Sequence, residues 1–458
     1  MMIPTRRRKP VAVAALIPKN TQTLLRKTIA VVALLAAAVG YVVVTPGNGL
    51  AQGFEDVALF QEAINSNFFG VDARAMSMGN AGIVTARDGS ALIFNPANLA
   101  RIRRIEARGG FTHLRLANET QWFHNGSILD GERDLNKSRI NAASLTMPVP
   151  TYRGSLVFAF GVHRINSFDR AFEVEIPDTI RPNYETSVGR ELETGSMWKW
   201  SAGGAIDISP RLSVGGALHL LTGGDEYSWT REYMHVSNVQ QNINLNNAID
   251  IDYLGVGATA GLLYQVSPEF STGFTVETPS FIQAEERFES VLDTNFSNYE
   301  WFETSFSEYS IRRPLTFAFG LAGQFERLTV AGDVRYRDWS QLDFNYEDDF
   351  LPDSREDQFI QDNLKESISL HLGGEYLFPD QGVSLRAGYY YDPLPISSDF
   401  IESNRQYFTV GGGFLIDRVM TVDVAFARGG YELRDFEPGD YFADYKTSRI
   451  FLTFAYRI

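Results

Sequence analysis

The chain has 458 residues, of which 44% are hydrophobic and 13% aromatic, with 39 Gly, no Cys and a formal net charge of −15. This content excludes an intrinsically disordered chain, and the absence of Cys excludes disulfides, thiolate nucleophiles and cysteine-ligated zinc. No apolar run after Val44 approaches the ~20 residues that a membrane-spanning helix requires. Any insertion into a membrane would therefore use strands.

The first 51 residues have the composition of a secretory leader. They carry seven basic residues, no acidic residue and an apolar run of sixteen residues, Ile29–Val44. Gly49 and Ala51 flank Leu50 in the way an A-x-A-like cleavage site requires. The pattern predicts a signal peptide over residues 1–51. The alternative is a retained membrane anchor, because the apolar run is nearly long enough to span a bilayer.

Removal of this leader would change the formal net charge from −15 to about −22, because the seven positive charges leave with it. A chain this acidic would repel phosphate groups, so we expect no nucleic-acid partner. An exported chain without thiols is typical of a bacterial cell envelope.

Residues 52–102 do not resemble strands. The stretch Ala73–Val84, ARAMSMGNAGIV, is rich in small residues. Pro96 lacks an N–H group and disfavours helix at Asn95, so Phe94–Ala97 should form a turn or an extended segment. Apolar side chains that could pack inside a larger structure are Met76, Met78, Ile83, Val84, Leu92, Ile93, Phe94 and Leu99.

From about residue 103 to 458 the dominant hydrophobic period is two, which is typical of strands. In the last segment Ile450, Leu452, Phe454, Tyr456 and Ile458 share one face. Fourteen such segments begin near Ile105, Asn141, Leu156, Trp198, Leu212, Val256, Phe270, Leu315, Leu328, Ile368, Val383, Phe408, Met420 and Arg449. An even count places both chain ends on one side of a membrane, as in bacterial single-chain barrels.

The connections between these segments alternate in length. Tight links are predicted at 150–154, 209–211, 267–269, 325–327, 379–381 and 417–418, and long polar excursions at 166–196, 223–250, 280–310 and 341–366. Short turns on one side and long loops on the other are typical of outer-membrane barrels. In hydrocarbon the backbone finds no water, so the strands must pair all the way round. The sequence therefore predicts an all-β, 14-stranded antiparallel transmembrane β-barrel.

Aromatic residues near the strand ends fall on the same strand face as the apolar residues that should point outward. We interpret them as an interfacial girdle, with ordinary strand formers as the alternative. They are Trp198, Trp200, Tyr336, Tyr376, Tyr389 and Tyr391. The excursion 280–310 is also rich in aromatic residues, which would need to pack together or receive an apolar ligand.

A fourteen-stranded barrel leaves an interior that side chains alone do not fill, so residues 52–102 are predicted to form an N-terminal hatch within a barrel over 103–458. The stretch ARAMSMGNAGIVTARDGSALIFNPANLARI followed by fourteen strand segments resembles the outer-membrane transporters of long-chain fatty acids and aromatic hydrocarbons (FadL/TodX-like, OMPP1). The hatch of that family contains an Asn-Pro-Ala motif. The resemblance covers the hatch by motif and the remainder by architecture.

The resemblance implies passive, hatch-gated diffusion of a hydrophobic small molecule across the bacterial outer membrane. A hatch role carries over to Asn95, Pro96 and Ala97, whereas no ligand-binding residue can be transferred. The implied partners are the ligand and outer-membrane lipid including lipopolysaccharide, with a monomeric chain and no cofactor. The family also includes barrels that serve secretion systems, so an interaction or shuttle protein is the alternative. The terminal Ile458 departs from the Phe that ends many outer-membrane barrels.

The sequence shows no pattern of an enzyme. There is no H-E-x-x-H zinc motif, no G-x-S-x-G nucleophile elbow and no Walker A sequence. Gly255–Gly261 resembles a dinucleotide loop, but the strand pattern continues through it, and its glycines are better explained by close approach to the hatch or by a bend. His163, His219 and His371 have the lumen parity and are assigned to its polar lining. We expect neither a metal nor a catalytic residue.

Overall fold

The computed structural model describes residues 70–124, 127–177, 184–235, 237, 242–294, 299–346, 360–397, 401–434 and 441–458. The predicted signal peptide and residues 52–69 of the predicted hatch lie outside the described residues. Among the residues that are described, no helix is long and apolar enough to cross a membrane.

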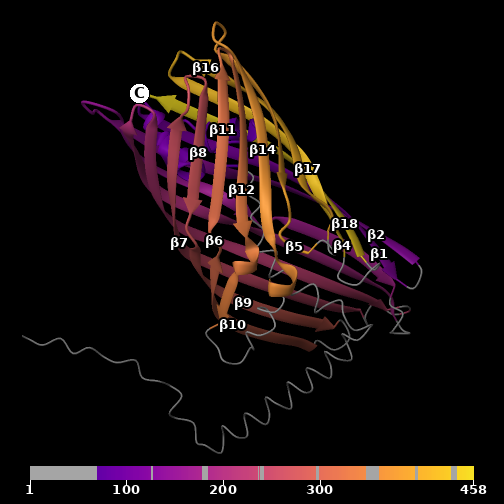
Figure 1. Cartoon of the computed structure of the whole chain (residues 1–458). Helices are drawn as coiled ribbons and strands as arrows, with labels where there is room; N and C mark the ends of the chain where they lie inside the picture. The colour runs from indigo at the N-terminus through magenta and orange to yellow at the C-terminus, as the bar shows by residue number, and fades with distance from the viewer. Residues whose placement is uncertain are drawn as a thin grey trace, which may run out of the picture. The chain divides into compact units, whose positions relative to one another are not determined.

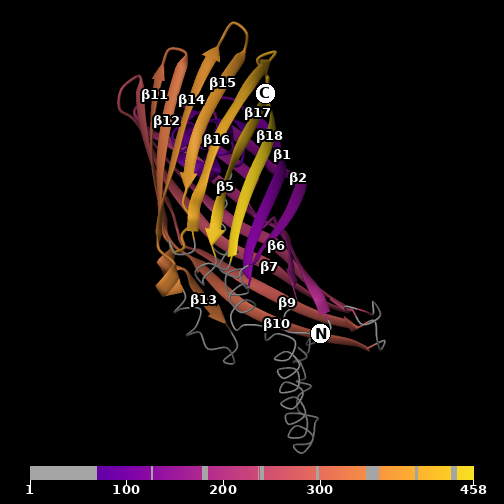
Figure 2. The same ribbon diagram turned by 90° about the vertical axis from the view of Figure 1, so that its right-hand side faces the viewer.

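The strands form one antiparallel sheet that closes on itself. The last strand, β18, pairs with β1 from Glu106↔Arg457 to Trp122↔Tyr441, and Figure 2 shows β18, β1 and β2 side by side at this seam. The strands are β1 Glu106–His124, β2 Ser127–Val149, β3 Leu156–Ser167, β4 Arg170–Pro177, β5 Tyr184–Ser209, β6 Leu212–His235, β7 Ile243–Gln265, β8 Phe270–Glu277, β9 Ser280–Thr294, β10 Tyr299–Arg313, β11 Thr316–Phe325, β12 Leu328–Asp338, β13 Asp343–Tyr346, β14 Glu366–Phe378, β15 Val383–Asp392, β16 Ile401–Ile416, β17 Met420–Arg434 and β18 Tyr441–Arg457.

These eighteen segments make fourteen barrel strands, because four strands are interrupted. β3 and β4 both pair with β5, and β8 and β9 both pair with β7. In the same way β10 with β11 and β12 with β13 each form one strand. Pro279 and Pro314 lie at two of the interruptions, where a residue without an N–H group cannot donate to the ladder. The predicted fourteen-stranded barrel is confirmed.

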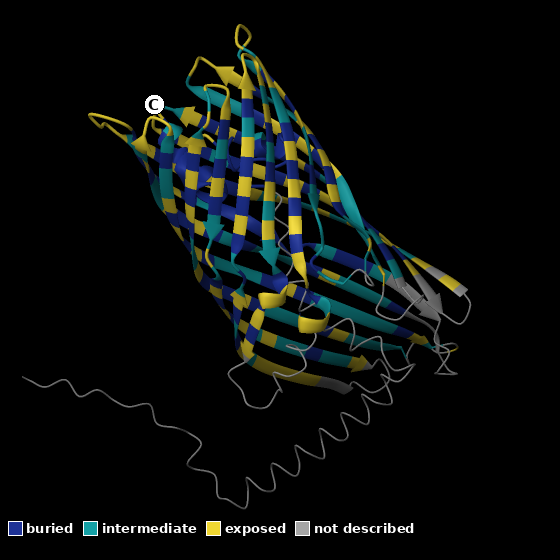
Figure 3. Cartoon of the chain, viewed as in Figure 1, coloured by how far each residue is buried: buried dark blue, intermediate teal, exposed yellow. Residues whose placement is uncertain are grey.

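Exposed and buried residues alternate along the strands, as Figure 3 shows in yellow and blue. In β18, Ile450 and Phe454 are exposed, whereas Phe451 and Thr453 between them are buried in the lumen. One face of each strand is thus apolar and outward, and the other faces the interior. The predicted girdle residues are on the outward parity, with Trp200, Tyr336 and Tyr376 exposed.

The six tight links lie where they are predicted, but most of the described residues in three of the predicted long loops are in paired strands. The described parts of 166–196, 223–250 and 280–310 lengthen the barrel strands, so that β5, β6 and β7 have 26, 24 and 23 residues. Figure 1 shows these strands and the β9–β10 hairpin extending away from the short turns. Polar residues remain in strand there because cross-strand partners satisfy their backbone, so side-chain polarity does not mark the strand end.

Short helices accompany the sheet. In the described part of the chain, three of them precede β1 and belong to the predicted hatch, namely α3 Ala73–Ser77, α4 Ala91–Phe94 and the 3-10 helix η2 Pro96–Arg101. Another, η4 Trp339–Gln341, interrupts the strand formed by β12 and β13.

Candidate functional site

Residues 70–102, the described part of the predicted hatch, are packed against the lumen-facing side of the wall. Every residue from 70 to 100 is buried except Arg74, which is partly exposed, and Arg87, which is exposed. The hatch contacts opposite sides of the barrel, because α3 packs near β16 and β17 while η2 packs near β5, β6 and β7. We use the name hatch for residues 70–102 from here on.

Side chains of three separate strands receive backbone N–H groups of the hatch. Ala73 N donates to Thr453 Oγ1 at 2.9 Å, Gly79 N to Thr409 Oγ1 at 3.0 Å and Ile83 N to Asp333 Oδ2 at 2.8 Å. The hatch has little regular structure of its own, so its backbone depends on these partners to remain satisfied while buried. Polar wall residues that face the lumen therefore supply the hatch with hydrogen-bond acceptors.

The predicted residues Asn95, Pro96 and Ala97 lie together at the contact between the hatch and β7. Asn95 is completely buried. Its Nδ2 donates to Ile83 O in the hatch and to Leu262 O in the wall, both at 3.0 Å, and its Oδ1 accepts from Ala97 N at 3.1 Å. Pro96 begins η2, where its missing N–H is not needed. Asn95 thus joins two turns of the hatch to the barrel.

Asn95→Asp is expected to destabilise the seated hatch by about 1–3 kcal/mol, because a carboxylate cannot donate and would face the Leu262 carbonyl instead. Asn95→Ala should cost less, since it removes the donor without placing a charge there. Amide hydrogen exchange of residues 70–102 measures the effect. Asn136→Asp, at an exposed position of β2, is the matched control, and equal exchange in both variants would contradict the assigned role.

Glycines of the wall lie where the hatch backbone approaches most closely. A Cβ atom at Gly261 would lie 2.0 Å from Asn95 Oδ1, and one at Gly373 would lie 2.1 Å from Met78 O. A Cβ atom at Gly215 would lie 2.5 Å from Ala97 N. The interpretation that Gly261 permits close approach to the hatch is confirmed, whereas Gly255 contacts the neighbouring strand β9 instead.

A buried arginine of β1 binds two carboxylates of the hatch. Arg108 Nη1 donates to Asp88 Oδ2 at 2.6 Å, and Nη2 donates to Asp72 Oδ1 at 3.2 Å. Asp72 also caps α3 by accepting from Ala75 N, and Asp88 accepts from Ser90 N just before α4. The same two carboxylates therefore shape the hatch locally and attach it to the wall.

This attachment continues as a chain of ion pairs along the lumen wall. Arg386 Nη1 donates to Asp423 Oδ1 at 2.7 Å, and its Nε donates to Glu375 Oε2 at 2.6 Å. Glu375 in turn binds Arg74 of the hatch, with 3.0 Å between Oε1 and Nη2. We call the set Asp72, Arg74, Asp88, Arg108, Glu375, Arg386 and Asp423 the hatch clamp.

The two hatch carboxylates differ in their electrostatics. Burial raises the pKa of Asp72 above its ordinary value, although Arg108 opposes this. Burial also opposes ionisation of Asp88, but Arg108 and the hydrogen bonds from Ser90 outweigh it and lower the pKa. Asp88 is therefore the carboxylate that depends more on its charge being matched by Arg108.

Beside the hatch lies a cavity of about 70 Å³ with a mostly polar lining. Its charged side chains are four basic and two acidic residues, which leave an excess of positive charge in an otherwise acidic chain. They are Lys199, Arg313, Arg335, Arg337, Glu277 and Asp392. Ile93 of the hatch also lines it, as does His371 of β14. The cavity thus borders directly on the hatch.

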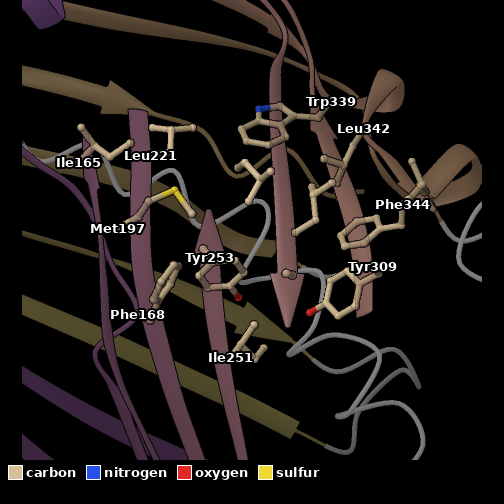
Figure 4. Packing of buried hydrophobic residues seen from close by; sticks show 14 of the residues in the cluster. Ile165, Phe168, Met197, Leu221, Ile251, Tyr253, Tyr309, Trp339, Leu342 and Phe344 are labelled. Carbon is tan, nitrogen blue, oxygen red and sulfur yellow. The ribbon is translucent and has the colours of Figure 1, made fainter. Parts of the chain in front are cut away.

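An apolar cluster adjoins this cavity and shares Ile165, Leu221 and Trp339 with its lining. Figure 4 shows these residues converging with Tyr253 and Phe344 from several strands. The remaining buried members are Phe168, Met197, Ile251, Ile282, Ala284, Tyr309, Ile311, Leu342, Ile360 and Leu364. The cavity therefore has polar and charged side chains on one side and an apolar cluster on the other.

The aromatic residues expected in the 280–310 excursion are divided between the two faces of the β9–β10 hairpin. Phe281, Phe302 and Phe306 are exposed on the outer face, whereas Tyr309 is buried in the apolar cluster. These four residues do not pack as one group, because successive strand residues point to opposite faces. The alternative, that the exposed aromatic residues receive an apolar ligand, stays a prediction.

The chain matches the family model described as outer membrane protein transport protein (OMPP1/FadL/TodX) over residues 61–432. The chain belongs to this family. The FadL/TodX family comprises outer-membrane transport proteins for hydrophobic compounds, which agrees with the closed barrel and its apolar outer face. It is a family of transport channels and not of enzymes, and it points to the bacterial outer membrane. A search of curated protein sequences finds no significant match.

Solved structures with the same fold are similar over most of both chains. The Pseudomonas putida toluene transporter TodX has a TM-score of 0.60 at 15% identity, covering 85% of this chain and 99% of its own. A Pseudomonas aeruginosa FadL homologue has a TM-score of 0.58 at 15% identity, covering 86% and 97%. The Ralstonia pickettii toluene transporter TbuX has a TM-score of 0.52 at 14% identity, covering 86% and 99%. At this identity the likeness shows the fold alone.

Sequence reasoning singles out Asn95, Pro96 and Ala97, whose gating role stays a prediction, but it misses the hatch clamp and the cavity. Its parity does assign His371 to the lumen side, where the structure buries it. The contacts of His371 come from the hatch and from the neighbouring strand β15. No spacing in the sequence indicates Arg108, because a single arginine in a strand pattern has no local signature. Among the described residues, no group of three or more His, Asp and Glu side chains could hold a metal.

Proposed function

We propose that this chain admits amphipathic molecules with an apolar body and an anionic head group, of which long-chain fatty acids are the model, by passive diffusion gated by the hatch. The observation that carries the proposal is the excess of basic side chains in a cavity that shares residues with an apolar cluster. A carboxylate is complementary to the arginines, whereas an aromatic hydrocarbon offers them no acceptor. Burial of the tail would supply about 25 cal/mol per Å² of apolar surface.

One copy of the chain closes a complete barrel. We therefore propose a monomer surrounded by outer-membrane lipid and lipopolysaccharide. Within it, the ligand would pass from the apolar cluster to the cavity and leave when the hatch shifts, with Asn95, Pro96 and Ala97 at the moving contact. No chemical reaction is required.

Laurate should bind about tenfold more tightly than methyl laurate, because the ester lacks the charge that pairs with the cavity arginines. Arg313→Gln should weaken laurate binding and leave methyl laurate binding nearly unchanged. Arg313 lines the cavity, and its Nε has no hydrogen-bond partner among the described residues. Arg312→Gln, at the exposed position next to it, is the control. Equal affinities for the two lipids, measured by calorimetry in detergent, would contradict an anionic ligand.

Deletion of residues 88–98 tests gating by the hatch. Single-channel conductance should be low in the intact chain and higher after the deletion. Uptake of labelled fatty acid by the deletion variant should no longer require movement of the hatch. The folded barrel is identified by its altered gel mobility on heating. If the intact chain conducts ions freely and the deletion changes neither conductance nor uptake, the hatch is not the gate.

A further inference from the structure

His371 lies between the cavity and the hatch. It is in the middle of β14, is 3% exposed and lines the cavity together with Asp392 and Arg335. On its other side its Nδ1 lies 3.0 Å from Gly79 O of the hatch. Because a carbonyl oxygen only accepts, Nδ1 must be the protonated nitrogen in this bond.

The peptide groups at Gly79 are held on both sides. Gly79 N donates to Thr409 Oγ1 of β16, and Gly79 O accepts from His371 of β14. Gly79 has φ +63° and the following Asn80 also has φ 63°, a left-handed turn that packs directly against the wall at Gly388. Two wall side chains therefore fix the turn that follows α3, and His371 is the one of these two that lines the cavity.

The second ring nitrogen of His371 is buried and unused. Nε2 has no hydrogen-bond partner among the described residues. The imidazole stacks on Tyr390, with 5.6 Å between ring centroids and 21° between planes, so the ring orientation is fixed by a neighbour as well as by the hatch. A buried polar atom without a partner, in a residue that lines a cavity, points to an acceptor or donor supplied by a ligand.

We propose that His371 contacts the head group of the ligand through Nε2 and couples its arrival to release of the Gly79 turn. A singly protonated imidazole donates from one nitrogen only. A ligand oxygen at Nε2 draws the proton there, and the number of protons on the ring is unchanged. Nδ1 then presents a lone pair to Gly79 O, and the bond to the hatch is lost. The inference rests on the proposed function and names the residue that links binding to gating.

Two substitutions separate the two nitrogens. The side-chain amide of His371→Asn replaces Nδ1 and can keep the bond to Gly79 O, but it reaches no further into the cavity. The longer amide of His371→Gln replaces Nε2 and can meet the ligand, but it leaves Gly79 O without its donor. His113→Asn, at an exposed position of β1, is the control for losing an imidazole.

The readout uses the absence of cysteine from the chain. Arg87→Cys places one nitroxide label at the exposed position of the hatch, and its mobility is followed by electron paramagnetic resonance with and without saturating laurate. Laurate affinity is measured on the same samples. The parent should bind laurate and gain label mobility. His371→Asn should bind about three- to tenfold more weakly and gain no mobility at saturation. His371→Gln should keep its affinity and be mobile without laurate.

The outcomes distinguish this inference from the proposed function. If both His371 variants respond to laurate as the parent does, the coupling role of His371 is overturned while the proposed function stands. If the parent does not bind laurate at all, the proposed function fails and the inference fails with it. A variant that lacks the heat-modified gel mobility of a folded barrel is refolded in detergent, and His113→Asn is refolded in the same way for comparison. If only the His371 variants fail to fold, His371 has a structural role and the proposal is overturned.

Discussion

Arg108→Gln is expected to loosen the seated hatch by about 3–5 kcal/mol, the cost typical of removing one partner from a buried ion pair. The side chain of Arg108 is 5% exposed and those of Asp72 and Asp88 are 3% and 4% exposed. Without the guanidinium, the two hatch carboxylates would remain buried against the lumen wall near Asp423, without the cation that balances them. Movement of the hatch toward water would relieve this. Amide hydrogen exchange of residues 70–102 and ion conductance should both increase.

Two comparisons isolate the charge effect of Arg108. Arg115 is on the same strand as Arg108, and Arg115→Gln removes its ion pair with Asp134 of β2. These two side chains are 63% and 38% exposed, so the stability of the seated hatch should change by less than about 1 kcal/mol. Combining Arg108→Gln with Asp88→Asn should restore part of the protection of the hatch amides against hydrogen exchange, because the uncompensated charge of Asp88 is removed as well. Unchanged exchange and conductance in Arg108→Gln would mean that the hatch clamp does not hold the hatch.

Gly388→Ala is expected to prevent the hatch from seating and to leave an ion-conducting barrel. A Cβ atom there would lie 2.1 Å from Gly79 N and 2.4 Å from Met78 C, which are backbone atoms without rotational freedom. Overpacking by one carbon usually costs about 1–3 kcal/mol when side chains can adjust, and here the backbone of the hatch must move. Single-channel conductance and hydrogen exchange of residues 70–102 measure the displacement.

Gly374→Ala is the matched control for this substitution. Gly374 is in the neighbouring strand β14, but a Cβ atom there would meet only Thr329 O at 3.8 Å, an ordinary contact. Both variants should assemble as barrels, since neither changes the pairing of the strands. If Gly388→Ala shows low conductance and the hatch amides exchange hydrogen as slowly as in the parent, close approach of hatch and wall at this glycine is not required to close the barrel.

Much of the barrel could be predicted from local patterns. The alternation of Ile450 with Phe451 and of Val424 with Ala425 indicates strand and also the outward face, because side-chain direction in a strand repeats every two residues. The ends of the long strands could not be predicted in this way. The polar excursion 223–250 predicts a loop, yet β6 and β7 pair within it from Gly223↔Tyr253 to Tyr233↔Ile243.

The contacts between the hatch and the wall divide along the same line. Asn95 could be singled out because Pro96 imposes a local backbone restriction and the surrounding motif resembles a family pattern. His371 has the correct parity in the sequence, but its hydrogen-bond partner Gly79 lies 292 positions away in the chain. Arg108 and Asp88 are only twenty positions apart, yet one is in a strand and the other in the hatch. Neither partnership leaves a periodic trace.

The amino-acid sequence by itself determined the strands, their inward and outward faces, the tight turns and the presence of a segment unsuited to strand before them. These properties depend on the chemistry of neighbouring residues, which the order of the chain contains directly. Only the tertiary structure decided which lumen residues hold the hatch, where the cavity lies and which glycines border on the hatch. The closure of the barrel brings distant residues within hydrogen-bonding distance, and a contact of that kind is defined by position in space rather than by separation along the chain.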